Sequence, residues 1–204
     1  EKQREKCDIK ELWVSTKCGE SDTTSGCGAN PSVGDAFDKL HGLGSTLCFG
    51  ETTELTGGEQ IVAARCANDK VREQFMFMFN RYQDVINRHK TSDLSESQPT
   101  KGNIAGGLTT ILEKSLGAIA KSGTTNLVDV VEFAQPVTAK GLVFMDTPGY
   151  DPVSATGQVA GGANLICFTT GRGSAYGCAP SPSLKLATNT ALWLKQQDDI
   201  DINC

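Results

Sequence analysis

The glycine-rich segment 99–117 combines groups that could bind an anion with groups that could move a proton. Four glycines, two adjacent threonines and the neighbouring Glu113 and Lys114 fall within these nineteen residues. Glycines let the backbone approach a ligand closely, and the free amides at a helix start favour an anion. The pattern predicts a loop that runs into a helix, with a base and a cation close to a bound anion.

Adjacent residues point about 100° apart on a helix, so only one of Glu113 and Lys114 can face a substrate squarely. A lysine in a cleft can act as a base near neutral pH, because burial disfavours its charged form. We therefore take Lys114 as the preferred catalytic base and Glu113 as the second catalytic candidate. The alternative is an ordinary solvent-facing helix. In the same segment, Asn103, Thr109 and Thr110 are candidates for substrate binding.

Thiol and carboxyl side chains gather in two separate polar segments. The first holds Cys18 and Asp22, and the second holds Glu51 and Glu54. Carboxylates suit Mg²⁺ or Mn²⁺, whereas an added thiolate shifts the preference toward Fe²⁺. These four residues are our candidate metal ligands, and ordinary turn and capping roles are the alternative.

A third polar segment follows the apolar run 164–169 and contains Thr169, Thr170 and Arg172. Hydroxyls, glycine amides and a guanidinium could hold a carboxylate there, and arginine can do so in a bidentate manner. Asn189, which follows the last long apolar run, is expected to join them as a substrate-binding residue. The alternative is a plain turn in which Arg172 pairs with a surface acid.

Short apolar runs alternate with helical patterns along the whole chain. This alternation predicts one α/β domain over residues 1–204, with a mainly parallel, Rossmann-like doubly wound sheet of about six or seven strands and helices on both faces. In such sheets ligands bind beyond the carboxyl ends of the strands, where the polar segments above lie. Residues 91–103 are predicted to form a long polar loop. The expected strands are 12–16, 45–50, 127–133, 142–146, 164–169 and 184–188, and the expected helices are 32–41, 58–67, 69–89, 110–121, 152–161 and 190–197.

Composition excludes several classes of protein. The net charge of −5 argues against nucleic acid or an anionic membrane as a partner, and no apolar run approaches the roughly 20 residues of a membrane span. The eight cysteines are scattered without a Cys-x-x-Cys pair, which favours reduced thiols in a cytoplasmic protein. The GTPase-like Asp146-Thr-Pro-Gly149 lacks a preceding phosphate-binding loop. With only His41 and His89 present, a serine–histidine triad is improbable.

Five segments, in this order along the chain, resemble the sugar-acid dehydratase family that includes altronate and galactarate dehydratases and is related to a sulfolactate sulfo-lyase. Family members are longer at the amino end, so the resemblance implies a carboxy-terminal catalytic domain. Many members carry a glycine where this chain has Glu20, which leaves the exact substrate open. The segments are Lys17-Cys-Gly-Glu-Ser-Asp-Thr-Thr-Ser-Gly26 with 29–31, Glu51-Thr-Thr-Glu54, 99–117, 146–149 with 154–157, and 168–173 with 187–189.

The resemblance implies a lyase that removes water from a sugar acid, altronate being favoured, to give a 2-keto-3-deoxy acid. The expected cofactor is a divalent metal, Fe²⁺ first and Mn²⁺ or Mg²⁺ as alternatives, which assists β-elimination. The expected partner is the small sugar-acid substrate, and the resemblance also suggests a homodimer. Two alternatives stay open: a sulfolactate lyase-like carbon–sulfur lyase, and a non-catalytic metal- or sugar-acid-binding domain that needs an amino-terminal part to turn over.

Overall fold

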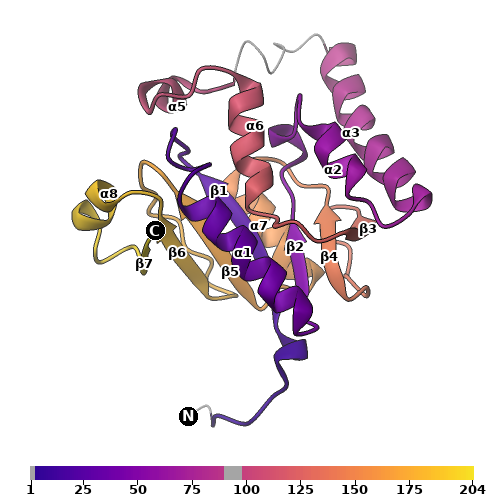
Figure 1. Ribbon diagram of the computed structural model, residues 1–204, viewed down its shortest axis with the longest axis horizontal. Coiled ribbons are helices and arrows are strands. Elements are labelled where there is room, and N and C mark those ends of the chain that lie inside the picture. The colour runs from indigo at the N-terminus through magenta and orange to yellow at the C-terminus, as the bar shows by residue number, and fades with distance from the viewer. Residues whose placement is uncertain (1–2, 90–97) are drawn as a thin grey trace.

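The described residues, 3–89 and 98–204 of a computed structural model, form a seven-stranded sheet in which every strand pairing is parallel (Figure 1). The strand order is β3-β4-β2-β1-β5-β6-β7, so β1 lies in the middle. The predicted α/β class and parallel sheet are therefore confirmed. The strands are β1 (Trp13–Gly19), β2 (Thr46–Phe49), β3 (Leu127–Val131), β4 (Gly141–Met145), β5 (Leu165–Thr170), β6 (Ser183–Ala187) and β7 (Ile202–Asn203).

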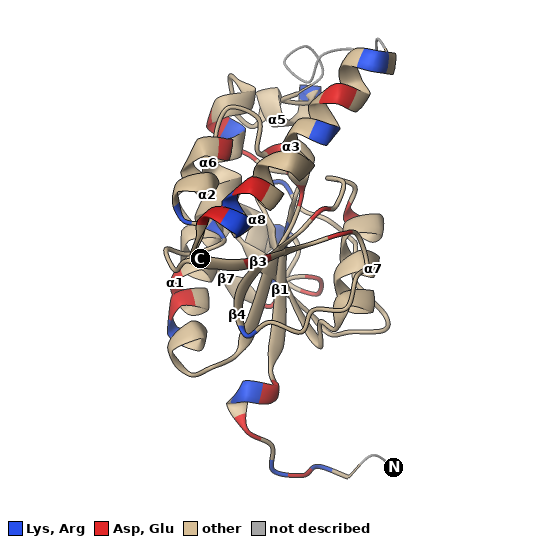
Figure 2. Ribbon diagram, turned by 90° about the vertical axis from the view of Figure 1, so that its right-hand side faces the viewer, with Lys and Arg blue, Asp and Glu red and all other residues tan. Residues whose placement is uncertain are grey.

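Helices cover both faces of the sheet, as a buried parallel sheet requires. Seen edge-on, α1, α2, α3 and α6 lie on one side and α7 lies on the other (Figure 2). The apolar strands are buried on both faces, and Leu142, Val143 and Phe144 of β4 expose no surface. The helices described are α1 (Ala29–Gly42), α2 (Glu59–Ala64), α3 (Asp69–His89), α5 (Lys101–Ala105), α6 (Ile111–Ala120), α7 (Asp151–Gly161) and α8 (Thr190–Lys195).

The longest helix, α3, has the bounds that its apolar period predicts. Val71, Phe75 and Met78 recur at helical spacing on one face and are buried in the main core. The Phe75 ring meets the Phe144 ring edge-on, with 5.2 Å between ring centroids. This contact fixes the helix on the sheet close to the carboxyl ends of β2 and β4.

Most predicted elements are present, with ends shifted by a few residues. The predicted polar loop 91–103 differs, because residues 101–103 open the short helix α5. There the Thr100 side chain accepts from the Asn103 backbone and the Asn103 side chain accepts from the Thr100 backbone, which caps the helix. Residues 91–97 of that loop lie outside the described residues, and the two-residue strand β7 has no apolar run that predicts it. Within the described part of the chain, no helix is both long and apolar enough to cross a membrane.

The carboxyl ends of the strands form the end of the sheet that matters for chemistry. In Figure 1, α5 and the first turns of α6 stand above this end, and the amino terminus lies at the opposite end. The chain leaves β1 toward β2 on one side, whereas β5 pairs with β1 on the other. Parallel sheets bind ligands where the strand order reverses in this way.

Candidate active site

Two adjacent residues at the end of β1 open toward opposite faces of the sheet. On the α7 side, the Lys17 Nζ lies 2.7 Å from an Asp151 carboxylate oxygen. On the α6 side, the Cys18 Sγ lies 3.2 Å from the Nζ of Lys121, which follows α6 directly. This alternation is the ordinary strand pleat. Because both side chains also approach Glu51, the site is assembled from both helical layers at once.

Glu51 is the centre of this group and is fully buried. Its Oε1 lies 2.5 Å from the Nζ of Lys17 and its Oε2 lies 2.6 Å from the Nζ of Lys121. The residue follows β2 with φ 70° and ψ 58°, a left-handed conformation that costs a non-glycine residue about 1–3 kcal/mol. The backbone N–H of Glu51 donates to the Thr147 hydroxyl at 2.8 Å, which holds the turn. The GTPase-like 146–149 segment therefore positions Glu51.

The oppositely charged groups of this cluster stabilise one another's charged forms, as their pKa values show. Burial alone would lower the pKa of Lys17, but Glu51, Cys18 and Asp151 raise it above its ordinary value. Burial likewise lowers the pKa of Lys121, but Cys18 and Glu51 outweigh this effect and raise the pKa above its ordinary value. The two lysines keep the pKa of Glu51 below its usual range despite burial. Burial and Glu51 raise the pKa of the Cys18 thiol, with Lys121 acting in the opposite direction. Two ammonium groups thus share one buried carboxylate.

Glu54 and Lys114 lie next to this cluster. The Lys114 Nζ is 3.1 Å from Glu54 Oε1 and donates to Gln98 Oε1 at 2.7 Å. The other oxygen of Glu54, Oε2, is buried and has no hydrogen-bond partner among the described residues. One ligand atom from each of Cys18, Glu51 and Glu54 lies within 4.8 Å of the others. A sulfur and two carboxylate oxygens, one of them unpartnered, form a donor set that fits a divalent metal such as Fe²⁺.

A cavity of about 480 Å³ opens directly above the cluster. Its volume is in the range of sites for small metabolites. Lys114 is the single lysine or arginine among the described residues that line it, and Asp151 faces it from the α7 side. Burial and Glu54 raise the pKa of Tyr82 to about 12, so its hydroxyl keeps its proton. The lining residues are Cys18, Gly19, Glu20, Ser21, Thr53, Glu54, Tyr82, Gln98, Thr100, Asn103, Lys114, Gly149, Tyr150 and Asp151.

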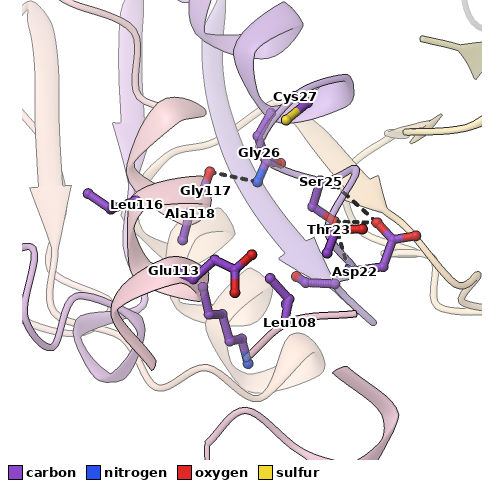
Figure 3. A pocket seen from close by; sticks show the side chains of 13 residues that line it. Asp22, Thr23, Ser25, Gly26, Cys27, Leu108, Glu113, Leu116, Gly117 and Ala118 are labelled. Carbon is purple, nitrogen blue, oxygen red and sulfur yellow. Dashed lines mark hydrogen bonds between the residues drawn. The ribbon is translucent and has the colours of Figure 1, made fainter. Parts of the chain in front are cut away.

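Two predicted site residues lie elsewhere. Asp22 is not in the Cys18–Glu51–Glu54 group: its Oδ1 accepts from the Thr24 hydroxyl at 2.6 Å and from nearby backbone amides. Glu113 accepts from the Thr109 amide and hydroxyl, which lowers its pKa, and is not part of the cavity wall. Both residues instead border a smaller neighbouring hollow of about 260 Å³, on opposite sides of it (Figure 3).

The predicted substrate-binding residues divide in the same way. Asn103 lines the cavity and donates to the Ser21 carbonyl at 2.7 Å. Thr169 is buried and bonded to Asn30 at 2.5 Å, so it ties β5 to α1. Asn189 caps α8 by accepting from the Leu192 amide. None of the other six is in the cavity wall as described: these are Thr109, Thr110, Thr169, Thr170, Arg172 and Asn189. Arg172 pairs with Glu20 at 2.6 Å.

Sequence reasoning missed Lys17, Lys121 and Asp151 as members of the site. Lys17 carries a signal, because it directly follows the predicted strand 12–16 and a charge buried in a strand needs a buried partner. Lys121 follows a helix, where a cation has an ordinary explanation in the helix dipole. Asp151 falls in the predicted strand-end segment after β4, but without an assigned role.

Residues 9–204 match the model of one protein family, described as D-galactarate/altronate dehydratase, C-terminal. The chain belongs to this family. A (2R)-sulfolactate sulfo-lyase subunit beta from Chromohalobacter salexigens is 58% identical over 206 residues, which cover the whole chain and 53% of the relative. A galactarate dehydratase (L-threo-forming) from Escherichia coli is 40% identical over the whole chain and 38% of the relative. An altronate dehydratase from Bacillus subtilis is 35% identical over 98% of the chain and 40% of the relative.

These family members bear the names of lyases, which supports a lyase. The chain spans about half the length of the sulfolactate relative and less of the two dehydratases. The relative with the highest of these identities acts on sulfolactate by its name, so the predicted preference for altronate is not confirmed. That relative is also named as a subunit, subunit beta.

Proposed function

We propose that this chain carries the catalytic centre of a lyase that releases sulfite from (2R)-sulfolactate. The observation that carries this proposal is the Cys18, Glu51 and Glu54 group beneath a cavity that Lys114 lines. The 58% identity to a sulfolactate sulfo-lyase subunit supports the choice of substrate. A thiol, two carboxylates and a cation at the carboxyl ends of parallel strands suit elimination from a 2-hydroxy acid.

Cys18, Glu51 and Glu54 would hold the metal, Fe²⁺ being the first candidate. When bound, a divalent cation supplies Lewis-acid stabilisation to the negative charge that develops on the substrate carboxylate. The unpartnered Glu54 Oε2 could ligate without taking Oε1 from Lys114. Lys17 and Lys121 hold the Glu51 carboxylate in place through one oxygen each.

Lys114 is the proposed base: in its neutral amine form, its Nζ accepts the proton at C2 of the substrate and becomes an ammonium group. The C2–H electron pair becomes the C2–C3 double bond, and the C3–S pair leaves with sulfite. The resulting enol ketonises to pyruvate, so atoms and electrons balance without an oxidant or reductant. Sulfite is a weak base that departs without prior protonation, so this reaction needs no general acid. Glu113, which is not part of the cavity wall, is not required in it.

Dehydration of a polyhydroxy acid such as altronate is the second candidate. The observation that favours it is the ring of hydroxyl and amide side chains along the cavity wall, which suits a substrate with several hydroxyls. Loss of water requires a proton donor for the departing hydroxyl. Tyr82, which keeps its proton, is the donor that the described wall offers. The other wall residues with hydroxyl or amide side chains are Ser21, Thr53, Gln98, Thr100, Asn103 and Tyr150.

The deciding experiment assays the purified protein, with and without Fe²⁺, for sulfite release from sulfolactate and for keto-acid formation from altronate and galactarate. We expect sulfite release that depends on metal, and a loss of about 10²–10⁴-fold in the Lys114→Met variant. Arg72→Met, which removes an exposed guanidinium on α3, is the matched control. Metal-dependent binding of an acid without any product would contradict a catalytic role and favour the binding-domain alternative.

A further inference from the structure

Glu20 lies at the wall of the cavity in a backbone conformation that side chains rarely adopt. Its φ is 50°, and among the described residues only Glu51 and Ala134 share a positive φ without being glycine. Glu51 is the centre of the candidate site, so two of the three such residues belong to this end of the sheet. Strained non-glycine residues gather at functional sites, which makes the Glu20 side chain a candidate for function.

Arg172 holds the Glu20 carboxylate in place. Its Nη1 lies 2.6 Å from Glu20 Oε2, and its backbone N–H donates to the Glu20 carbonyl at 3.0 Å. The guanidinium lies against α5 at Gly102, where an added Cβ would come within 2.0 Å of Nη1. The arginine therefore contacts the wall residue Glu20 and the helix α5, although it is not itself part of the cavity wall.

The cavity wall offers no cation for a second anionic group of a bound substrate among the described residues. The wall contains the acids Glu20, Glu54 and Asp151, and its single lysine or arginine among the described residues is Lys114, the proposed base. A substrate with one carboxylate can be held by the metal group of Cys18, Glu51 and Glu54, which leaves Lys114 to act as the base. A substrate with a further sulfonate or carboxylate needs another cation, and Arg172 is the cation that pairs with the wall residue Glu20.

We propose that Arg172 binds the second anionic group of a dianionic substrate, and that Glu20 takes this place when the substrate is absent. The Glu20–Arg172 pair is partly exposed, with 51% and 37% of the two side chains accessible. Exchange of one anion for another on an exposed guanidinium is therefore cheap. The inference deepens the proposed function and rests on it, because it assigns the class of acid that the same cavity selects.

Two unreactive acids of matched length test this without turnover. 3-Sulfopropionate carries two anionic groups and butyrate carries one, and neither has the 2-hydroxyl of a substrate. We expect calorimetric titration of the Fe²⁺-loaded protein at low salt to give a lower Kd for 3-sulfopropionate than for butyrate. In Arg172→Met the Kd for 3-sulfopropionate rises about three- to tenfold, and that for butyrate stays within about twofold.

Glu20 variants are expected to act in the opposite direction. Glu20→Gln keeps the shape and removes the competing charge, so the Kd for 3-sulfopropionate falls about threefold. Glu20→Gly also removes the left-handed strain, and it guards against loss of affinity through misfolding. Arg72→Met serves as the control for removing an exposed arginine.

Two results would show that the Glu20–Arg172 pair is merely structural and would overturn the inference. One is an equal change in Kd for both acids, and the other is a change in the same direction in the Arg172 and Glu20 variants. Sulfite release is measured on the same samples. Opposite shifts in Kd without any sulfite release would leave Arg172 as an anion site and overturn the proposed reaction. Sulfite release with equal shifts in both acids would do the reverse.

Discussion

Two ion-pair networks in this protein share one design and differ in burial. At the carboxyl end of β1, Lys17 pairs with Glu51 and Asp151. On α3, Arg81 pairs with two carboxylates of the β3 and β4 ends in the same manner. The Lys17 side chain is 1% accessible and that of Glu51 is fully buried, whereas the Arg81 side chain is 38% accessible.

The difference in burial separates ion pairs that we associate with function from exposed ion pairs that contribute little to stability. Removing ions from water costs several kcal/mol each, and apolar residues of similar volume often replace buried pairs without loss. A fold does not need two buried lysines around one glutamate. Exposed pairs cost little and contribute little. The buried network is therefore the part of the molecule that we propose as the functional site.

The largest effect is expected from Glu51→Gln. This change leaves two buried ammonium groups without their shared carboxylate, which should lower the free energy of unfolding by about 3–5 kcal/mol in urea denaturation. Glu132→Gln, which removes an exposed partner of Arg81, is the matched control and should cost less than about 1 kcal/mol. Equal losses in the two variants would erase the distinction between the networks.

Cysteine labelling tests whether the buried cluster activates its thiol. Burial raises the pKa of Cys18, so at pH 8 iodoacetamide should modify it at least about a hundredfold more slowly than the exposed thiols. Peptide mass spectrometry separates the sites, and Cys48, a buried thiol away from lysines, is the internal reference. Labelling of Cys18 at the rate of Cys27 would mean that Lys121 holds a reactive thiolate. The exposed thiols are Cys7, Cys27 and Cys204.

A smaller effect is expected at the surface network. Arg81→Met keeps an apolar stem over the Phe77 ring and loses two ion pairs, so it should lower stability by about 0.5–1 kcal/mol. The loss should shrink as salt is added, because exposed charges are screened. A loss above about 3 kcal/mol that does not respond to salt would show that this network behaves like the buried one.

The smallest effect concerns a carboxylate held by amides. The Asp38 carboxylate accepts from Thr124 and Thr125, and these bonds lower its pKa although burial opposes them. Its contribution is therefore present above the unfolded-state pKa of about 3.9 and is lost as the pH falls through the lower folded value. The difference in Tm between the protein and Asp38→Asn should be small at pH 6 and should close toward pH 3. A difference that widens in acid would contradict this sign.

Much of the fold follows from local pattern, since apolar runs bounded by polar segments locate six of the strands. The sequence predicts that Cys18, Glu51 and Glu54 lie close together, because the carboxyl ends of parallel strands meet at one edge of the sheet. The lysines could not, because their burial depends on partners far along the chain: Lys121 meets Cys18 across 103 positions. The short helix α5 could not be predicted from the sequence for another reason. Its capping signal stands inside a polar stretch that has no helical period.

One carboxylate, that of Glu51, receives a lysine from each side of the sheet. Local opening of α6 would therefore take Lys121 from this carboxylate, and local opening of α7 would take Asp151 from Lys17, which pairs with the same carboxylate. The two helical layers should behave as a single cooperative unit near this end, and amide hydrogen exchange should report one shared opening energy for both. The carboxyl end of the sheet would then be the last region to open.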